Sequence, residues 1–364
     1  MEKIKVLHII NNLGVGGAER VLLLLLEELS KKKDIEIYLV SLEGHGELED
    51  EFKKLPINFK KFHFHLFNPF FRRFELYFRL RLFLYAKKVN PNIIHGHLIK
   101  GEDFAKVLGG LLNKPVLTTS HDCYIHPGRK QKWLNRYLTK AIAVSEIVKD
   151  HLVKVYGLSG DKIIVIPNGI RSEEYRGSLK EFSEKKPVFM YLGRLIEKKG
   201  VQFAIEGLSS LVKEFPGIKF LIFGDGPYRA DLERIVREKS YDFVEFRGLV
   251  KDVPGSFREG DVFILPSKSE GFSMGVLEAI ASGKPVIATK TGAIPGMVEE
   301  GINGYFVEYG KAKDIEISGR KILDRDISEM QLASLEKAKD QFDIEIISKK
   351  YYNLYLIMLG EKNV

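Results

Sequence analysis

Short apolar runs alternate with helical patterns from one end of the chain to the other. A first series of runs has the length and composition of buried strands and covers residues 4–10, 35–42, 92–97, 115–121, 141–145 and 162–168. A second series covers residues 187–193, 219–224, 243–248, 261–267 and 285–290. Buried strands separated by amphipathic helices are typical of βαβ units, whose strands form parallel sheets. The pattern therefore predicts an α/β protein with two parallel sheets.

A charged segment that contains structure breakers, RSEEYRGSLKEFSEKKP at 171–187, separates the two series. We predict a Rossmann-like N-terminal domain over residues 1–170, a linker over 171–186 and a second Rossmann-like domain over 187–345. Residues 346–364 are expected to form a helix that packs back toward the N-terminal domain. Ligands of open α/β sheets bind beyond the carboxyl ends of the strands. With two doubly wound domains facing each other, we expect the ligand site in the cleft between them.

The composition is that of a soluble globular enzyme. The chain has 364 residues, of which 45% are hydrophobic and 29% charged, and this length suits two domains. Cys123 is the only cysteine, which excludes an intrachain disulfide framework and a thiolate metal cluster. The sequence opens on the charged strand EKIKVLHII, which is not a signal-peptide pattern, and its longest apolar run, at 21–29, contains Glu27 and Glu28. We therefore expect a cytoplasmic protein.

The net charge of +8 indicates an anionic partner. Because the sequence has no zinc-finger spacing and no RNA-binding aromatic signature, we favour phosphorylated ligands or an anionic membrane over nucleic acid. Part of the positive charge gathers in residues 65–88, where the one acidic residue, Glu75, stands against Arg72, Arg73, Arg79, Arg81, Lys87 and Lys88.

The same basic segment carries phenylalanines at helical spacing, namely Phe67, Phe70, Phe71, Phe74 and Phe78. One interpretation is a helix that lies on the inner face of an anionic membrane and reaches a lipid-linked acceptor. The other is a helix whose aromatic face packs into the N-terminal domain. Leu80 and Phe83 fall off the stripe, so the pattern does not decide between the two.

Two glutamates frame the stretch EGFSMGVLE at 270–278. In one continuous helix Glu270 and Glu278 would point about 80° apart, on neither one face nor opposite faces. The small residues between them favour a loop at Glu270, a helix that starts near Ser273, and Glu278 on its first turns. Free backbone N–H groups at a helix start bind anions. The stretch therefore predicts a ligand that carries an anionic group and hydroxyls for two carboxylates.

A basic turn follows the strand predicted at 187–193. Arg194 can bind phosphate oxygens through two parallel hydrogen bonds, and Lys199 can add a point charge. The alternative is a solvated basic turn, but its place at the carboxyl end of a strand favours a ligand site. Further glycine turns at 223–227 and 246–250 also follow strands and are suited to lining a planar base.

The first strand leads into the glycine-containing turn NNLGVGGAER at 11–20. The dinucleotide fingerprint G-x-G-x-x-G fails here, because its third glycine would fall on Glu19. What remains is a strand, a turn at Gly16 and Gly17, and a helix, where the backbone can approach a phosphate or a sugar. A tight turn that needs positive φ would explain the glycines almost as well. His121, at the end of a strand, could contact a sugar hydroxyl or cap the strand.

Other polar clusters are interpreted as structural. His95 and His97, like His63 and His65, are spaced to share a strand face as metal ligands would, but no neighbouring carboxylate or thiolate completes either set. The D-x-D sequence at 324–326 resembles metal-binding sequences of sugar-nucleotide enzymes. It precedes a helical pattern and lies away from any strand end, so we interpret it as a helix cap.

Taken together, the motifs identify a family resemblance that extends over nearly the whole chain. EGFSMGVLEAIASGKPVIAT at 270–289 resembles the E-x7-E motif of the family 4 retaining glycosyltransferases, which have the two-domain B-type glycosyltransferase fold. Five further motifs follow the family's order, namely GGAER at 16–20, TTSHD at 118–122, VIPNGI at 165–170, GRLIEKKG at 193–200 and FGDGP at 223–227. The resemblance implies an acceptor-binding N-terminal domain and a nucleotide-sugar-binding C-terminal domain.

The resemblance also implies roles for individual residues. Arg194 and Lys199 would grip the donor's diphosphate, Glu270 would hold hydroxyls of the donor sugar, and His121 would contact the transferred sugar; these four form the implied catalytic set. The remaining nucleotide-sugar contacts would come from the ribose ligand Glu278, from the backbone around Phe272, Ser273 and Met274 at the distal phosphate, from Gly16 and Gly17, and from Gly248 to Val250 beside the base.

The implied reaction is transfer of a hexosyl group from a nucleotide diphosphate sugar, such as a UDP-sugar or a GDP-sugar, to an acceptor hydroxyl with retention of configuration. The acceptor would be a glycan or lipid-linked, in cell-surface polysaccharide or glycolipid assembly. No metal cofactor is expected, since protein cations would take the place of magnesium. A sugar-nucleotide epimerase and a catalytically silent sugar-nucleotide binder remain alternatives. Two positions depart from the family pattern, Arg171, where aspartate is frequent, and Ser273, where glycine is frequent.

Overall fold

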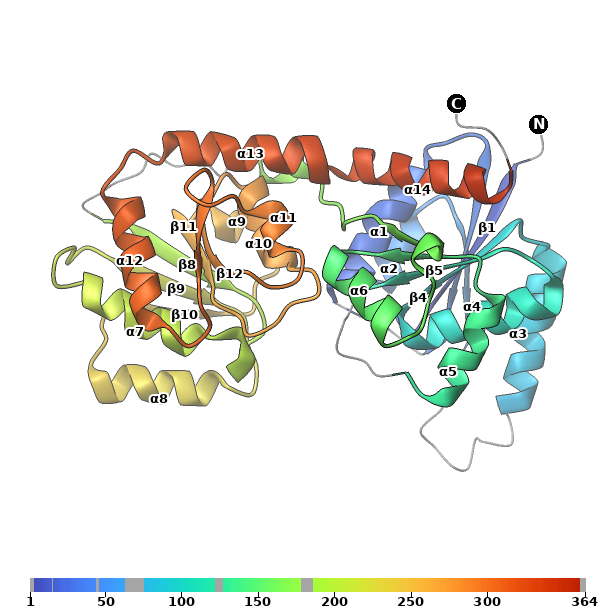
Figure 1. Ribbon diagram of the computed structural model, residues 1–364, viewed down its shortest axis with the longest axis horizontal. Helices are drawn as coiled ribbons and strands as arrows, with labels where there is room; N and C mark the ends of the chain where they lie inside the picture. Colours follow the sequence, from blue (N-terminus) through green and yellow to red (C-terminus); the bar gives the residue numbers. More distant parts are fainter. Residues whose placement is uncertain are drawn as a thin grey trace. The chain divides into compact units, whose positions relative to one another are not determined.

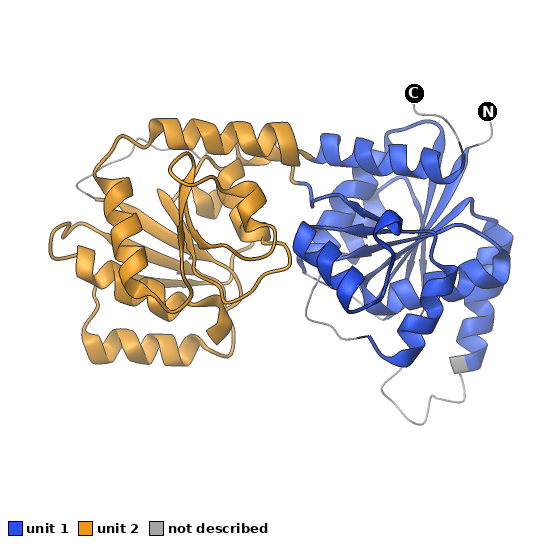
Figure 2. Ribbon diagram, viewed as in Figure 1, with its two compact units in different colours: residues 1–169, 344–364 blue, residues 170–343 orange. Residues whose placement is uncertain are grey.

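The fold is described from a computed structural model of the chain, which describes residues 3–14, 16–43, 46–62, 75–121, 127–177 and 186–360. The chain divides into two compact units (Figures 1 and 2). Unit 1 comprises Met1–Gly169 and Ile344–Val364, and unit 2 comprises Ile170–Asp343. Each unit is built on one parallel sheet with helices packed on it, so the predicted α/β class with two doubly wound sheets is confirmed.

The sheet of unit 1 has the strand order β3-β2-β1-β4-β5-β6-β7, and all of its pairs are parallel. Its central strands are buried almost throughout, as expected for strands covered on both faces. The strands are β1 Ile4–Ile10, β2 Ile35–Ser41, β3 Asn58–Lys61, β4 Ile93–His97, β5 Val116–Ser120, β6 Lys140–Ala143 and β7 Ile163–Val165. The sequence pattern missed β3, an edge strand of four residues with alternating exposure.

Helices cover the sheet of unit 1 because each has one apolar face. In α1 that face consists of Val21, Leu22, Leu25, Leu26 and Leu29, which recur at helical spacing and are all buried. The helices of unit 1 that precede the crossing are α1 Gly17–Ser30, α2 Glu49–Lys54, α3 Glu75–Val89, α4 Leu98–Leu112, α5 Arg129–Leu134 and α6 Glu146–Lys154. Two 3-10 turns add η2 Asn135–Tyr137 and η3 Gly160–Lys162.

Unit 2 repeats the doubly wound plan with the strand order β10-β9-β8-β11-β12-β13. Its strands are β8 Val188–Leu192, β9 Lys219–Phe223, β10 Val244–Gly248, β11 Val262–Leu265, β12 Val286–Thr289 and β13 Gly304–Val307, the last of which the sequence pattern missed. Its helices are α7 Val201–Leu211, α8 Arg229–Lys239, α9 Val253–Phe257, α10 Met274–Ala281, α11 Ile294–Met297, α12 Ala312–Leu323 and α13 Ser328–Phe342, with 3-10 turns η4 Ser172–Tyr175 and η5 Glu197–Lys199.

The last helix, α14 Ile344–Met358, belongs to unit 1 although it follows unit 2 in the sequence. Its buried residues Ile344, Ile347, Tyr351, Leu354 and Tyr355 join the hydrophobic core of unit 1. Because α14 supplies core side chains, unit 1 is complete only with the end of the described chain.

The chain crosses between the units at two adjacent points, Gly169–Ile170 and Asp343–Ile344. Residues 171–177, the first part of the predicted linker, lie in unit 2, because the Tyr175 side chain is buried in the core of that unit. The Ser172 hydroxyl also donates a hydrogen bond to Asp343 Oδ2 at 2.5 Å. Residues 178–185 of the linker lie outside the described residues.

Candidate functional site

The candidate ligand site of unit 2 lies where its strand order reverses, between β8 and β11. Loops that leave two such strands diverge above the sheet, and ligands of doubly wound folds bind there. The loop after β8 carries Arg194 and Lys199, and the loop after β11 carries Glu270. The Lys268 N–H donates to the Lys198 carbonyl at 2.8 Å, which fixes one loop against the other.

A partly buried ion pair joins these two loops. Lys199 Nζ lies 2.7 Å from Glu270 Oε1, and the exposed fractions of the two side chains are 20% and 8%. The Ser267 hydroxyl donates to the same carboxylate oxygen at 2.5 Å. The sequence analysis assigned Lys199 and Glu270 to different parts of a donor, whereas the structure brings their side chains into direct contact. The pair therefore forms one polar unit at the edge of the sheet.

Tyr191, near the end of β8, supports this edge from below. Its hydroxyl donates to the Arg194 carbonyl at 3.0 Å. Burial, followed by the nearby negative charge of Glu270, raises the pKa of Tyr191 well above its usual value, so the hydroxyl stays a donor. The sequence analysis did not select Tyr191, because a tyrosine inside an apolar run gives no signal beyond that of a core residue.

Arg194 differs from Lys199 in having an exposed side chain. It forms no ion pair with the residues that the structure describes, whereas Lys199 is paired with Glu270. An exposed guanidinium beside a helix start can bind the oxygens of a phosphate through two parallel hydrogen bonds. The Arg194 guanidinium is therefore the cationic donor at this edge of the sheet that is placed to bind a ligand.

Helix α10 begins where the sequence predicts it. Ser273 is its N-cap, and the Ser273 hydroxyl oxygen accepts from the Val276 N–H at 3.4 Å. Phe272 and Met274, on either side, are half-buried. Glu278 follows on the second turn and is buried, as is Glu270 in the loop before the helix. The loop-and-helix geometry proposed for the two glutamates is confirmed.

Neighbouring glycine loops pack closely against the same edge. The Gly224 N–H donates to the Gly248 carbonyl at 2.7 Å, and a Cβ on Gly224 would lie 1.9 Å from the Gly193 carbonyl oxygen. The loops after β8 and β9 thus leave no room for a side chain at Gly224, and the end of β10 is bonded to the second of these loops. Beyond Gly248, Val250 is half-buried against the core, while Leu249 is 80% exposed.

We expect Gly200→Ala to destabilise unit 2 by more than its backbone angle explains. Gly200 has a φ of 75°, and an added Cβ would lie 2.2 Å from the Pro266 carbonyl oxygen. Gly301 has the same φ of 75° but no atom within 4 Å of such a Cβ, so Gly301→Ala is a matched control. A left-handed backbone costs about 1–2 kcal/mol in either variant, and the clash adds about 1–3 kcal/mol at Gly200. Hydrogen exchange of the α7 amides measures the difference, and equal protection in both variants would contradict it.

The corresponding edge of unit 1 lies between β1 and β4, and Gly16 and Gly17 begin α1 there. Gly16 is the N-cap with a φ of −113°, and Gly17 is the first helical residue. The interpretation as a turn that needs positive φ is therefore wrong. An added Cβ at Gly16 would lie 2.2 Å from Glu19 Oε2, the end of a flexible side chain, so a side chain here would displace the Glu19 carboxylate. Burial raises the pKa of Glu19, the residue at the position of the missing third glycine.

Three buried histidines lie side by side at the centre of unit 1. His8 Nδ1 is 3.0 Å from His97 Nε2, and the ring nitrogens of His95 are 2.9 Å from the Tyr355 hydroxyl and 2.8 Å from the Thr119 hydroxyl. One nitrogen from each ring lies within 4.8 Å of the others, a spacing that can hold a metal ion. Because both His95 nitrogens already have protein partners, the geometry favours the structural role. His63 and His65 lie outside the described residues.

We expect the stability of unit 1 to fall as the pH is lowered from 7 to 5. Burial lowers the pKa of His8 to about 3 and holds the pKa values of His95 and His97 well below 6.5. Below pH 6.5 the unfolded chain therefore binds protons that the folded chain does not, and each such histidine costs about 1.4 kcal/mol per pH unit. For His8 this loss continues down to about pH 3.

Urea unfolding followed through Trp133, the single tryptophan of the chain and a residue of unit 1, measures this dependence. His8→Asn should reduce the slope by about one proton. The same pH dependence in His8→Asn and in the wild type would show that His8 is already charged in the folded protein, since Glu102 and other groups contribute equally to both.

His121 follows β5 directly and lies beside this cluster, because its charge contributes to the lowered pKa of His95 and His97. The preceding residue, Ser120, donates to Glu102 Oε1 at 3.0 Å. Burial raises the pKa of Glu102 to about 7. The last residue of β5, directly before His121, is therefore bonded to Glu102, a residue that the sequence analysis had not selected.

The predicted site residues fall into two groups. In unit 2 the loops and helix start around one sheet edge carry Arg194, Lys199, Gly248, Val250, Glu270, Phe272, Ser273, Met274 and Glu278. In unit 1 the corresponding edge carries Gly16, Gly17 and His121. The D-x-D sequence lies between α12 and α13, where the Asp326 carboxylate accepts from the Ser328 N–H at 2.9 Å. The N-cap position of α13 is Ile327, which makes no side-chain cap bond, so Asp326 forms a turn just before the helix in place of the predicted cap.

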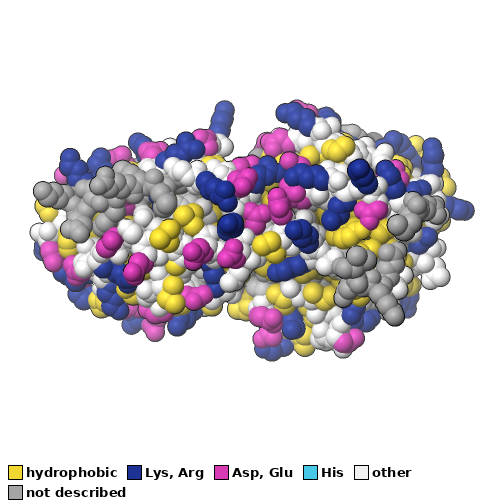
Figure 3. Space-filling view, turned by 90° about the horizontal axis from the view of Figure 1, so that it is seen from above, with side chains coloured by type: hydrophobic (Ala, Val, Ile, Leu, Met, Phe, Trp, Pro, Cys, Tyr) yellow, Lys and Arg dark blue, Asp and Glu magenta, His cyan; other side chains and the backbone are white. Residues whose placement is uncertain are grey.

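None of the described helices combines the length and the apolar content needed to cross a lipid bilayer. Of the predicted phenylalanine stripe, the four residues from Phe67 to Phe74 lie outside the described residues. Phe78, in α3, is half-buried. On the face shown in Figure 3, basic and acidic side chains are interspersed, so the excess positive charge does not form a continuous field there.

Comparison with known proteins assigns both units to one family. Residues 15–174 match the model of glycosyltransferase family 4, and residues 186–324 match the model of the glycosyl transferases group 1. The chain therefore belongs to the group 1 glycosyltransferases of family 4, which are enzymes that transfer glycosyl groups.

Two relatives and one solved structure illustrate the similarity. The chain is 26% identical over 320 residues to sulfoquinovosyl transferase SQD2 of Arabidopsis thaliana, a match that covers 78% of this chain and 61% of that protein. It thus spans less than two thirds of that relative. It is 25% identical over 315 residues to the UDP-Gal:alpha-D-GlcNAc-diphosphoundecaprenol alpha-1,3-galactosyltransferase of Escherichia coli, covering 78% of this chain and 80% of the relative.

The crystal structure of Anabaena Alr3699/HepE in complex with UDP superimposes with a TM-score of 0.81 at 20% identity, covering 96% of this chain and 99% of that one. The same protein has been solved with UDP-glucose. The match shows that the two doubly wound units form the B-type glycosyltransferase fold, as the resemblance implied.

Proposed function

We propose that this chain transfers a hexosyl group from a UDP-sugar to an acceptor hydroxyl, with retention of the anomeric configuration. The observation that carries the proposal is the edge between β8 and β11, where an exposed Arg194, the Lys199–Glu270 pair and the start of α10 lie in adjoining loops. The choice of uridine is supported by HepE, which binds UDP and UDP-glucose, and by the UDP-Gal transferase relative. Unit 2 would bind the donor and unit 1 the acceptor.

In the proposed reaction the bond between the anomeric carbon and the β-phosphate oxygen breaks, and the departing UDP gains negative charge. Arg194, Lys199 and the first N–H groups of α10 are fixed donors that stabilise this charge. The acceptor oxygen bonds to the anomeric carbon on the same face, and its proton passes to the departing phosphate oxygen. Since protein cations balance the diphosphate, no metal ion is required.

The other predicted residues hold the donor in place. Glu270 accepts hydrogen bonds from sugar hydroxyls while it remains paired with Lys199, and Glu278 accepts from the ribose. His121 contacts the transferred sugar, and the backbone at Gly16 and Gly17 approaches the donor. The acceptor would be a glycan or a lipid-linked glycan in cell-surface polysaccharide or glycolipid assembly, at the inner face of the cell membrane.

Two measurements on the pure protein test this function. A thermal-shift screen of UDP, GDP and their sugars should show stabilisation by UDP, by about 2.7 kcal/mol at a hundredfold excess over its Kd. Slow hydrolysis of the correct UDP-sugar should then release UDP, also after EDTA treatment. Stabilisation by GDP alone would refute the assigned base. Binding without any release of UDP would indicate a silent binder, and loss of turnover with EDTA would refute the metal-free mechanism.

A further inference from the structure

A pocket of about 230 Å³ lies inside unit 1 between α3 and α4, and the start of α5 completes it. Its lining is mainly hydrocarbon and comprises Leu82, Phe83, Phe104, Val107, Leu108 and Leu111. Pockets for drug-sized ligands occupy roughly 300–1,000 Å³. This pocket is therefore too small for a nucleotide sugar and suits a segment of an apolar chain.

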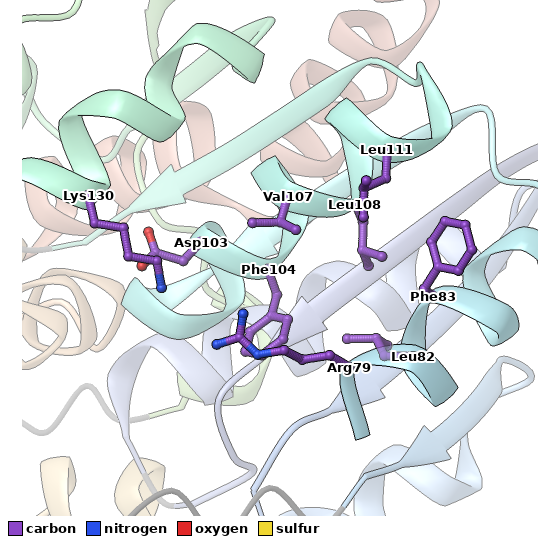
Figure 4. Close-up of a pocket in the computed structure, with 9 residues that line it drawn as sticks. All are labelled: Arg79, Leu82, Phe83, Asp103, Phe104, Val107, Leu108, Leu111 and Lys130. Atoms are coloured by element: carbon purple, nitrogen blue, oxygen red, sulfur yellow. The ribbon is translucent and has the colours of Figure 1, made fainter. Parts of the chain in front are cut away.

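Charged side chains lie at one end of this pocket. Figure 4 shows Lys130 and Asp103 together at one end, with Phe83 and Leu111 toward the other, and the Arg79 guanidinium beside Phe104. The Arg79 guanidinium carbon lies 5.6 Å from the centre of the Phe104 ring. The pocket thus joins an apolar interior to a mouth with two cations and one carboxyl group.

The carboxyl group at the mouth, that of Asp103, has hydrogen-bond and charge partners of its own. Asp103 Oδ2 already accepts a hydrogen bond from Gln131 Nε2 at 3.1 Å. Burial raises the pKa of Asp103, while Lys106, Gln131 and Lys130 lower it. The nearby Lys106 ammonium is itself buried and bonded to Asn135 Oδ1 at 3.0 Å. Arg79 and Lys130 are therefore the two cationic side chains that line the mouth of the pocket beside Asp103.

The outer face of α3 extends the apolar surface beyond the pocket. Leu76, Leu80 and Leu84 are four residues apart and have exposed fractions of 77%, 53% and 52%. At about 100° per residue, this stripe adjoins the face of α3 that bears Phe83. Leu111, which lines the pocket, is 65% exposed. An exposed apolar stripe of this kind marks an interaction site.

The charged residues around this stripe indicate what kind of partner binds to it. On α3 the exposed stripe lies among Arg79, Arg81, Lys87 and Lys88, with Glu75 as the acidic residue of the helix, and the full sequence has a net charge of +8. Hydrophobic side chains interspersed with cations fit the surface of an anionic bilayer, where the leucines enter the acyl region and the cations meet phosphates.

The polar end of the pocket lies next to the ligand edge of the unit 1 sheet. Asp103 follows Glu102, which accepts the hydrogen bond from Ser120 at the end of β5, and His121 is the next residue. Through Glu102 and Asp103, helix α4 thus connects the pocket to the strand end that precedes His121, the residue proposed to contact the transferred sugar.

We propose that the α3–α4 pocket holds the hydrocarbon chain of a lipid-phosphate acceptor drawn from an anionic bilayer, with its phosphate bound by Arg79 and Lys130. The acceptor role rests on the proposed function, whereas the lipid site itself can be tested without turnover. Chain and phosphate occupy opposite ends of the pocket, and the glycan attached to the phosphate extends toward His121.

Calorimetric titration with dodecyl phosphate tests the site. We expect saturable binding that Val107→Phe, which fills the pocket, weakens by at least about tenfold. The double variant Arg79→Gln/Lys130→Gln should weaken binding by a similar factor. The double variant Lys149→Gln/Lys154→Gln on α6 removes the same amount of charge elsewhere in unit 1 and should leave binding unchanged. Dodecyl maltoside, which carries no charge, should bind about tenfold more weakly than dodecyl phosphate. Unchanged binding in Val107→Phe, or in the Arg79 and Lys130 variant, would overturn the proposal.

Flotation with vesicles tests the bilayer as the source. The wild type and the α6 control should float with vesicles of phosphatidylcholine and phosphatidylglycerol, and the Arg79 and Lys130 variant should stay at the bottom of the gradient. If the wild type binds dodecyl phosphate but does not float, the lipid does not come from a bilayer. If the wild type forms dimers that Val107→Phe abolishes, a second copy of the chain covers this surface instead of a lipid. Arg79 and Lys130 lie outside the core, so the variant that replaces both should fold. It can therefore test the proposal even if Val107→Phe does not fold.

UDP binding and UDP-sugar hydrolysis in the same preparations separate this inference from the proposed function. Both should be retained in the pocket variants, because Arg79, Val107 and Lys130 are not among the residues assigned to the donor or to the transferred sugar. If the wild type binds the lipid but does not bind UDP, the proposed function is refuted and the pocket assignment stands. Donor binding without lipid binding would refute the pocket assignment alone.

Discussion

Arg194→Ala is expected to lower kcat/KM for glycosyl transfer by a factor on the order of 10²–10³ while leaving the thermal stability unchanged. The Arg194 side chain is exposed and makes no ion pair with the described residues, so its removal uncovers no buried charge. Its proposed partner is the diphosphate, whose negative charge increases as the glycosidic bond breaks. Loss of one such electrostatic donor costs about 2.7–4 kcal/mol in the barrier.

Steady-state kinetics with the UDP-sugar identified by the thermal-shift screen measure this loss. Arg194→Lys keeps the charge but not the paired geometry and should recover only part of the rate. Arg237→Ala, an exposed arginine on α8, serves as a matched control and should behave as the wild type. A wild-type rate in Arg194→Ala would show that the diphosphate is held elsewhere, and the proposed site would have to be abandoned.

The fold could be predicted from the sequence because its main strands are apolar on both faces. Runs such as those of β1, β8 and β11 can only be buried in the middle of a parallel sheet. The short strands β3 and β13 escaped prediction: β3 alternates exposed and half-buried residues at a sheet edge, and β13 has only four residues after a turn. Edge strands lack the two-sided burial that makes the pattern visible.

The linker shows a different limit of the sequence pattern. Its charge content indicated an exposed connection, but Tyr175 is buried in unit 2 and Ser172 binds Asp343, 171 residues away. A local pattern cannot show that two crossings of the chain lie next to each other. The structure therefore assigns the start of this segment to unit 2.

For the site, the sequence identified positions and not contacts. Arg194, Lys199 and Glu270 could be selected because each follows a buried strand, and the doubly wound order brings two of those strand ends together. The ion pair between Lys199 and Glu270 spans 71 residues, and the histidine cluster joins His8 to residues 87 and 89 positions further on. Such pairings depend on strand order and register, which hydrophobic periodicity does not contain.

Lys199→Ala and Glu270→Ala are each expected to reduce kcat/KM by about 10²-fold or more, but with unequal effects on stability. Without Lys199 the buried Glu270 carboxylate keeps the hydrogen bond from Ser267 but loses its cationic partner, and a buried charge that loses a partner costs about 1–3 kcal/mol. Without Glu270 the Lys199 ammonium, 20% exposed, can turn to solvent, so that variant should lose less. The double variant should regain part of the stability and none of the activity.

A double-mutant cycle separates these effects. Hydrogen exchange of the α10 amides reports the stability of unit 2, and the coupling between the two side chains should be about 0.5–3 kcal/mol. Strictly additive losses of stability would show that the 2.7 Å contact contributes nothing in solution. Recovery of turnover together with stability in the double variant would mean that the pair only holds the loops together. Recovery of stability alone would show that the two charges are retained for the donor, because the fold is then as stable without them.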